Sequence, residues 1–184
     1  MLMLFAGGRQ TDVNLSDTED SAQARIQLWR EGLELFKTAP VFGIGKGEYE
    51  EEVVQVAHNS FVHCFTELGM FGGTLFTGAF FLAGWPLHKA GVHGKGVLAP
   101  DLLRLRPYRQ AAVLAYVVGM FSLSRAYIVP TYLMPGLAAC YLGLPGVAGR
   151  VPTLKMTARL VGILALVSVL TLAGLHVFVR IYAR

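Results

Sequence analysis

Two long apolar runs set the strongest constraint on how this chain folds. Leu160–Val179 has 20 residues and no charge, and Phe61–Trp85 has 25 residues with Glu67 as its one acid. At 1.5 Å per residue, helices of these lengths cross a hydrocarbon core of about 30 Å. Only 15% of all residues are charged, against about 25% in soluble domains. The sequence therefore predicts an all-α integral membrane protein, and its two cysteines exclude a disulfide scaffold.

Two weaker apolar runs lie between the strong ones. Ala111–Ser124 is short and reaches the length of a span only with residues 108–110, whereas Ala126–Val147 contains three prolines. We predict about four transmembrane helices from the four runs. Because proline removes a backbone donor, the two middle runs can instead pair as one broken or re-entrant segment.

The charges are sorted along the chain. Residues 1–59 carry five Lys/Arg and ten Asp/Glu, a net charge of −5, whereas residues 60–184 carry eleven and two, a net charge of +9. We predict an extracytoplasmic loop over 1–59 and a transmembrane region over 60–184. The stretches 86–110 and 148–159 together hold eight Lys/Arg, which places both in the cytoplasm. Residues 1–59 are then periplasmic in a bacterium, and the basic residues are topology signals, not a nucleic-acid site.

The loop segment has an order of its own. Met1–Ala6 is too short for a span or a signal peptide, and it resembles the last turns of a helix whose beginning is missing. An amphipathic helix is predicted over 21–37, with Asp17–Asp20 as its capping stretch and Pro40 after its end. Its apolar stripe consists of Ile26, Trp29, Leu33 and Phe36.

Two motifs of the loop segment have ordinary explanations. Gly43-x-Gly45-x-Gly47 has neither the spacing nor the strand–helix context of a dinucleotide loop, so a turn is favoured. Glu50–Glu52 are adjacent acids, which rarely converge on one cation, so a solvated face is favoured.

The first apolar run contains several chemically active groups. His63 and Glu67 share a helix face, but without a third firm ligand we expect no metal and no cofactor. Cys64 and Cys140 lie in apolar runs and are interpreted as small hydrophobic residues. Glu67 is costly inside a span, so it either bonds to a neighbouring helix or has a function.

The entry to this run combines a cap with a titratable group. Asn59 and Ser60 are expected to cap the helix, which leaves His58 just before it at the membrane interface. Histidine titrates near neutral pH and is a natural general base. Taken alone, His58 and Arg25 are ordinary interfacial and surface residues.

Taken in order, these motifs form a pattern. The chain reads Ser21-x-x-x-Arg25-x-x-x-Trp29, then Pro40 to Gly45, then His58-Asn59-Ser60, then Glu67-Leu68-Gly69-x-x-Gly72. Over residues 16–147 this order resembles the O-antigen ligase superfamily of bacterial envelope glycosyltransferases. That superfamily includes O-antigen ligases, O-antigen and capsule polymerases, and protein O-oligosaccharyltransferases.

The resemblance implies a reaction and its participants. A glycan passes from a polyprenyl diphosphate to an acceptor hydroxyl of lipid A-core, a glycan or a protein, outside the bacterial inner membrane. Arg25 and His58 are the implied catalytic residues: Arg25 contacts the diphosphate, and His58 activates or orients the hydroxyl. Asn59, Glu67 and Trp29 are further substrate-binding candidates, although packing is the preferred role of Trp29.

This chain has fewer predicted spans than the members of the family it resembles. Family members have ten or more spans, so this chain resembles the C-terminal portion of one, and a missing N-terminal half is an expected partner. The alternative is a non-catalytic small membrane accessory or scaffold protein, with a piece of a transporter as a more remote reading. Ligase and polymerase are not separated, because both catalyse the same substitution on different acceptors.

Overall fold

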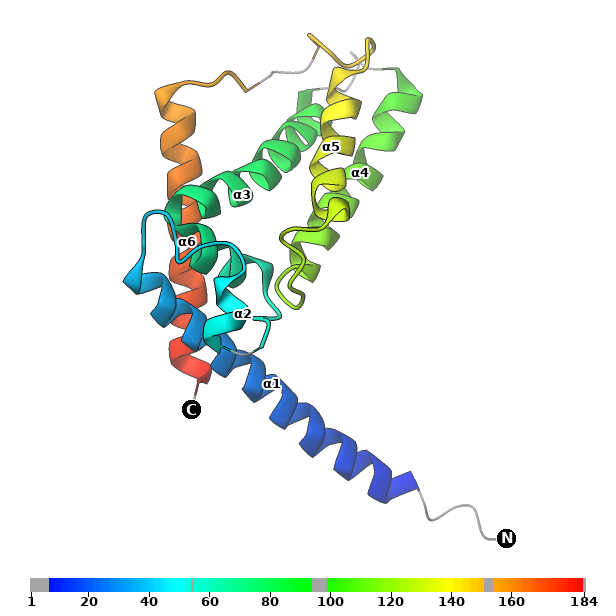
Figure 1. The fold of residues 1–184 in the computed structure, drawn as a ribbon. Helices are drawn as coiled ribbons and strands as arrows, with labels where there is room; N and C mark the ends of the chain where they lie inside the picture. The colour runs from blue at the N-terminus through cyan, green and yellow to red at the C-terminus, as the bar shows by residue number, and fades with distance from the viewer. Residues whose placement is uncertain (1–6, 54, 94–98, 151–153, 184) are drawn as a thin grey trace, which may run out of the picture.

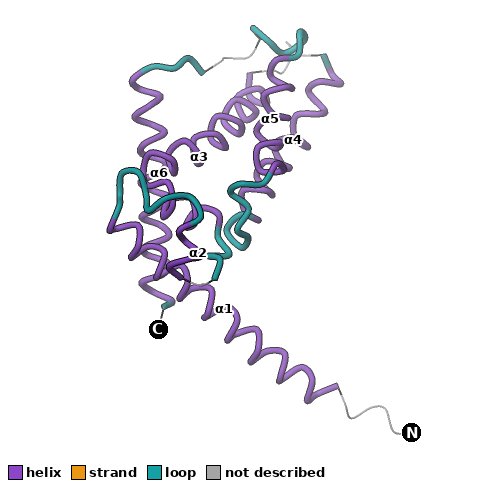
Figure 2. The backbone as a smooth tube through the Cα atoms, in the orientation of Figure 1, coloured by secondary structure: helices purple, strands orange, loops and turns teal. Residues whose placement is uncertain are grey.

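The computed structural model describes residues 7–53, 55–93, 99–150 and 154–183. Within these ranges the chain forms six helices and no strand (Figures 1 and 2). The predicted all-α class is thus confirmed for the described residues. The helices are α1 (Gly7–Thr38), α2 (Glu48–Val53), α3 (Ser60–His93), α4 (Pro100–Gly119), α5 (Val129–Gly143) and α6 (Ala158–Tyr182).

Two of these helices are long and apolar enough to cross a membrane. They are α3, over Ser60–Val92, and α6, over Ala158–Tyr182, which contain the two strongest apolar runs of the sequence. The helices α4 and α5 differ from the predicted spans in their bounds. The apolar run Ala111–Ser124 contributes only the second half of α4, and α5 has 15 residues, about 22 Å of helix. The predicted count of four membrane crossings therefore stays a prediction.

The first helix is longer than the sequence pattern predicted. The residues Asp17–Asp20 lie inside α1 and do not cap it, because the helix already begins at Gly7. Ser, Asp and Asn lower helix stability by well under about 1 kcal/mol each, and no proline interrupts residues 7–38, so the helix continues through them. The predicted end before Pro40 is confirmed. The segment Met1–Ala6 lies outside the described residues.

The longest apolar helix, α3, organises the bundle. It packs against α1, α4, α5 and α6, and α1 also packs against α6. Figure 1 shows α3, α4, α5 and α6 alternating in direction, while the first half of α1 projects away from the bundle. The beginning of α3, the ends of α4 and α6, and the loops 39–47 and 120–128 therefore gather at one end of the bundle, here named the loop end.

A polar contact joins α3 and α6, the two helices that are long and apolar enough to cross a membrane. The hydroxyls of Thr77 on α3 and Ser168 on α6 lie 2.6 Å apart, and both side chains are buried. Hydrogen bonds between small hydroxyl residues are typical of packed transmembrane helices, because apolar contact gives little net preference over lipid. This contact holds α6 against α3 and so helps to keep the end of α6 beside α1.

Candidate functional site

The helix α3 is broken at Gly69, two turns after it begins. Gly69 has φ 64° and ψ −165°, which no residue of a regular helix adopts. The break removes helical partners from backbone groups on both sides of it, and the loop of residues 40–47, here named the glycine loop, replaces them. Ile44 and Gly45 donate their N–H groups to the carbonyls of Thr66 and Glu67, at 3.1 and 3.0 Å.

After the break the direction of the hydrogen bonds is reversed, and N–H groups of α3 donate to carbonyls of the glycine loop. The N–H groups of Met70 and Phe71 donate to the carbonyls of Pro40 and Val41, at 2.8 and 3.1 Å. Unpaired backbone groups are very costly in apolar surroundings, so a break in a membrane helix needs such partners. The four hydrogen bonds explain why the glycine loop and the break occur together.

Glycine is required on both sides of this contact. A Cβ atom on Gly43 would lie 2.2 Å from the backbone of Glu67, and a Cβ atom on Gly69 would lie 2.4 Å from the backbone of Val41. Both residues also have positive φ. The motifs Pro40 to Gly47 and Glu67 to Gly72 are therefore the two halves of one structural unit. The sequence analysis predicted a turn over Gly43–Gly47 but not its partner.

Glu67 is the centre of a buried polar cluster at the same place. Its side chain is 0% exposed. One carboxylate oxygen accepts the N–H groups of Gly47 and Tyr49, at 2.8 and 3.3 Å, and lies 3.1 Å from Nε2 of His63. The other accepts the hydroxyl of Tyr127 at 2.5 Å. Glu67 thus joins α3 to α2 and to the 120–128 loop.

The tyrosines of the cluster act as neutral donors. Burial and the hydrogen bond to Glu67 raise the pKa of the Tyr127 phenol above its usual value, so the phenol keeps its proton. Burial likewise raises the pKa of Tyr49, whose hydroxyl donates to the carbonyl of Leu28 at 2.7 Å. The Lys46 ammonium lies 5.2 Å from the centre of the Tyr127 ring. Sequence reasoning identified Glu67 but missed Tyr49 and Tyr127, because neither forms a local motif with it.

The start of α3 confirms the predicted cap in part. The Asn59 side-chain oxygen accepts the N–H groups of Phe61 and Val62, at 3.0 and 3.1 Å, which is the geometry of an N-cap. Ser60 has a different role, because its hydroxyl donates to the carbonyl of Leu123 and accepts the N–H of Arg125 at 2.8 Å. Asn59 Nδ2 is buried without a hydrogen-bond partner in the described structure.

His58 has an unusual backbone. Its φ is +50°, and among the described residues it is the one non-glycine residue with positive φ. This conformation costs about 1–2 kcal/mol for most residues, and it is met more often for His, Asn and Asp. His58 is half-buried, whereas Asn59 and Ser60 beside it are fully buried. Its positive φ and half-buried side chain set His58 apart from the two buried residues that follow it at the loop end.

Trp29 links the helix of Arg25 to the segment of His58. Its indole N–H donates to the carbonyl of Ala57 at 2.7 Å, and its ring lies 5.7 Å from that of Phe178 on α6. Arg25 is exposed and lies one turn before Trp29 on the same face of α1, where such neighbours have Cβ atoms about 5–6 Å apart. Arg25 and His58 thus flank one contact, at the same end of the bundle.

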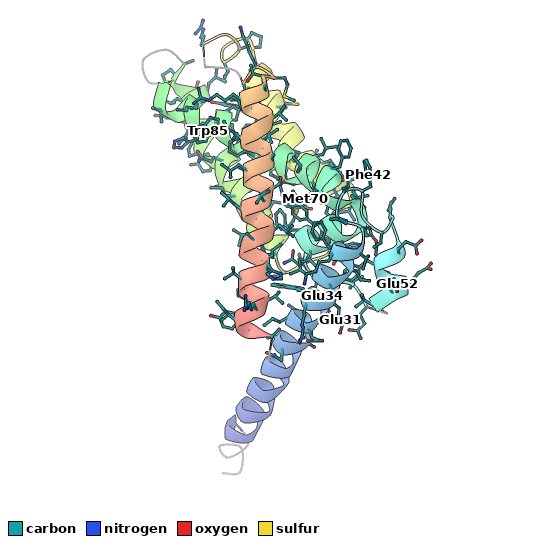
Figure 3. All side chains as sticks on the ribbon, turned by 90° about the vertical axis from the view of Figure 1, so that its left-hand side faces the viewer. Glu31, Glu34, Phe42, Glu52, Met70 and Trp85 are labelled. Carbon is teal, nitrogen blue, oxygen red and sulfur yellow. The ribbon has the colours of Figure 1, made fainter. Side chains whose placement is uncertain are left out.

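The remaining candidates fall outside this arrangement. Glu50–Glu52 are exposed on α2, as predicted for a solvated face, and Figure 3 shows Glu52 pointing away from the helices. Cys64 is buried and Cys140 is exposed, and both are free thiols. Among the described residues no group of three or more His, Cys, Asp and Glu gathers to hold a metal ion.

Comparison with known proteins identifies the segment that contains this site. No curated protein and no solved structure matches the chain. The family model described as O-antigen ligase matches residues 2–77, which include α1, the glycine loop, His58, and α3 through its break. The predicted resemblance is therefore confirmed for the matched part of the chain: residues 2–77 are similar to the O-antigen ligase family model.

Proposed function

We propose that this protein transfers a glycan from a polyprenyl diphosphate to an acceptor hydroxyl at the outer face of a bacterial inner membrane, as the O-antigen ligase type of enzyme does. The match over residues 2–77 carries the proposal. In this reaction the bond from the anomeric carbon to the diphosphate oxygen breaks while the acceptor oxygen bonds to that carbon. The hydroxyl proton must leave, and the diphosphate departs with the electron pair.

His58 is the proposed base. It would take the proton of the acceptor hydroxyl and pass it to water after transfer. Two features of the structure support this role. His58 is half-buried directly before the start of α3, and its strained φ of +50° is the kind of backbone cost that is found at functional sites.

Arg25 is the proposed partner of the diphosphate. Its guanidinium stays protonated and can form two parallel hydrogen bonds with phosphate oxygens. The contact between Trp29 and Ala57 supports one site for the two residues, because Arg25 lies one turn before Trp29 and His58 follows Ala57. Charge that develops on the leaving diphosphate would be stabilised there.

Asn59, Glu67 and Trp29 are proposed to support these two residues. Asn59 would hold the start of α3 beside His58, since its side-chain oxygen caps that helix. Glu67 would fix the glycine loop and Tyr127 around the site through its hydrogen bonds. Trp29 would hold α1 in place, since its N–H and its ring are both engaged within the protein.

The membrane arrangement of the proposal follows the charges. In it the two middle apolar runs, 111–124 and 126–147, also cross the bilayer, so that the stretches 86–110 and 148–159 are cytoplasmic and the loop end is periplasmic. A lipid-linked donor with its head group at the outer surface would then meet Arg25 and His58 directly.

The test uses variants at the chromosomal locus, so that any partner of the chain is present. Replacing His58 with glycine is the decisive change, because glycine adopts a φ of +50° without strain. Loss of a general base should lower the rate of transfer by about 10²–10⁴-fold. Replacing Arg25 with glutamine should lower it by about a hundredfold or more. Transferred glycan is quantified on the acceptor, and protein amount is measured in the membrane fraction.

Matched controls exist on the same helices. Arg30 is an exposed arginine on α1, and His88 is an exposed histidine near the far end of α3. Arg30→Gln and His88→Gln should leave transfer unchanged. If His58→Gly and Arg25→Gln also transfer glycan at the parental rate, the chain is not the catalyst. The alternative, a non-catalytic membrane accessory or scaffold protein, then replaces the proposal. In a deletion strain, accumulated lipid-linked polymer would indicate a ligase, and accumulated single repeat units a polymerase.

A further inference from the structure

A second region of the loop end has the features of a lipid-binding site. A groove of about 630 Å³ runs between α4 and the start of α5, which is within the range of pockets that hold small ligands. Its lining is apolar apart from one charged residue, Arg125. The lining residues are Ala112, Ala115, Tyr116, Gly119, Met120, Leu123, Arg125, Ile128, Pro130 and Met134.

One wall of the groove is formed by α4 and the other by α5 and the 120–128 loop. On α4 the small residues Ala112, Ala115 and Gly119 leave a hollow along the helix. Across the groove, the hydroxyl of Thr131 donates to the carbonyl of Arg125 and lies 2.9 Å from the Tyr116 hydroxyl. These two contacts hold α5 and the 120–128 loop at a fixed distance from α4.

The charged end of the groove adjoins the proposed site. The N–H of Ser60 donates to the carbonyl of Met120 at 2.8 Å, and the Ser60 hydroxyl accepts the N–H of Arg125 at 2.8 Å. Both Met120 and Arg125 line the groove. His58 is two residues before Ser60, so the backbone of Arg125 lies next to the segment that contains His58.

We propose that this groove binds the isoprenoid chain of the polyprenyl diphosphate and that Arg125 joins Arg25 in binding its diphosphate. The inference rests on the proposed function, because it places the lipid of the proposed donor. Charge complementarity selects the occupant. An apolar chain gains little when it moves from lipid into an apolar groove, so a preference for the groove must come from an anionic head group at Arg125.

The size of the groove argues against a helix of a partner protein as the occupant. A helix with its side chains is about 10 Å wide, so a volume of 630 Å³ holds less than two turns of one. A single hydrocarbon chain is narrower and can follow the hollow along α4. The groove also extends the site beyond residues 2–77, since α4 and α5 lie outside the family match.

The test measures lipid binding and not transfer. The full chain is reconstituted in vesicles that contain a polyprenyl diphosphate with a photoreactive group in its isoprenoid chain, and cross-linked peptides are identified by mass spectrometry. Cross-links should fall on α4 and α5 residues of the groove. Excess unlabelled polyprenyl diphosphate should suppress them, whereas excess phosphatidylglycerol should not.

Two variants with matched controls make the test specific. Ala115→Trp fills the hollow and should abolish the cross-links, whereas Ala173→Trp, at an exposed position of α6, should not. Arg125→Gln should weaken binding about tenfold or more through loss of a charge-assisted hydrogen bond, and Arg180→Gln, at the same end of the bundle, should not. Thermal unfolding of each variant shows whether the protein remains folded.

The outcomes separate this inference from the proposed function. Cross-links that fall outside the groove, that phosphatidylglycerol suppresses equally, or that survive Ala115→Trp would overturn the inference, even in a strain with normal transfer. Groove cross-links that respond as expected would uphold it, even if His58→Gly left transfer unchanged and so refuted the proposed base.

Discussion

Replacing Gly43 with alanine tests how firmly the glycine loop is seated in the α3 break. The chain offers a matched control, because Gly47 also has positive φ, 95° against 78° for Gly43. A Cβ atom on Gly47 would meet nothing within 4 Å, whereas one on Gly43 would lie 2.2 Å from the carbonyl of Glu67. The two substitutions share backbone strain and differ in the close approach to α3.

The expected magnitudes follow from this difference. Gly47→Ala should cost about 1–2 kcal/mol of unfolding free energy, the strain of alanine in the left-handed region. Gly43→Ala should add the loss of the hydrogen bonds from Ile44 and Gly45 to α3, at about 1 kcal/mol each. We therefore expect a total cost above about 3 kcal/mol for Gly43→Ala.

Trypsin cleavage after Lys46 provides the assay. Lys46 lies in the glycine loop between the bonded residues Gly45 and Gly47, so cleavage there requires the loop to leave α3. Cleavage in detergent should be slow for the parent, moderately faster for Gly47→Ala and much faster for Gly43→Ala, in parallel with lower thermal unfolding midpoints. Equal cleavage rates for the two variants would refute the seating of the loop in the break.

Two further predictions concern the buried cluster. Glu67→Leu leaves the donors of Gly47, Tyr49 and Tyr127 without their acceptor and also removes the contact with His63. Thermal unfolding in detergent should therefore show a loss of stability above about 3 kcal/mol. Glu67→Gln keeps one acceptor oxygen and should lose less, and equal losses would contradict the assigned bonds. The second prediction concerns pH. The pKa of buried Tyr49 is raised above the value of about 10 for an unfolded tyrosine. The contribution of its protonated phenol to the free energy of unfolding is therefore fully present below pH ~10 and is lost as the pH rises further. Tyr49→Phe should therefore flatten the alkaline decline of stability, and an unchanged decline would argue against burial of the phenol.

The helices α3 and α6 and the second half of α1 could be predicted because each depends on a pattern along the sequence alone. The runs that form α3 and α6 are long and nearly free of charge, and such runs have few alternatives in a membrane. The apolar stripe with Trp29 and Leu33 placed the second half of α1 correctly, since periodicity marks the buried face. The N-cap role of Asn59 followed from its position directly before an apolar run.

The helix α4 begins earlier than the apolar run that predicted a span, and charged contacts explain the difference. Hydrophobicity alone placed one span over residues 111–124, but the helix begins at Pro100 and includes Arg104, Arg106 and Arg109. Arg106 donates to Gln110 at 2.8 Å, and the Arg109 guanidinium lies 5.4 Å from the Tyr141 ring. Such contacts let charged residues continue a helix that a hydropathy pattern ends.

The candidate site was predicted in its parts but not in its connections. The motifs around Gly43, His58 and Glu67 were each recognised, whereas the seating of the glycine loop in the Gly69 break was not. That contact depends on backbone hydrogen bonds between segments more than 20 residues apart, and no side-chain pattern encodes them. Arg125 was counted only as a topology signal, because its place at the mouth of a groove depends on how α4 and α5 pack.

The central claim is that the Arg25 guanidinium and the His58 imidazole face one space at the periplasmic surface. Cross-linking tests this in intact inner-membrane vesicles of known orientation, on the background Cys64→Ser/Cys140→Ser. The pair Arg25→Cys/His58→Cys is treated with a short, membrane-impermeant bifunctional thiol reagent, beside the control pair Arg104→Cys/His58→Cys, whose positions lie at opposite ends of the bundle. The account predicts an intramolecular cross-link for the first pair alone, formed only from the periplasmic side. No cross-link for that pair, or one formed only from the cytoplasmic side, would contradict it.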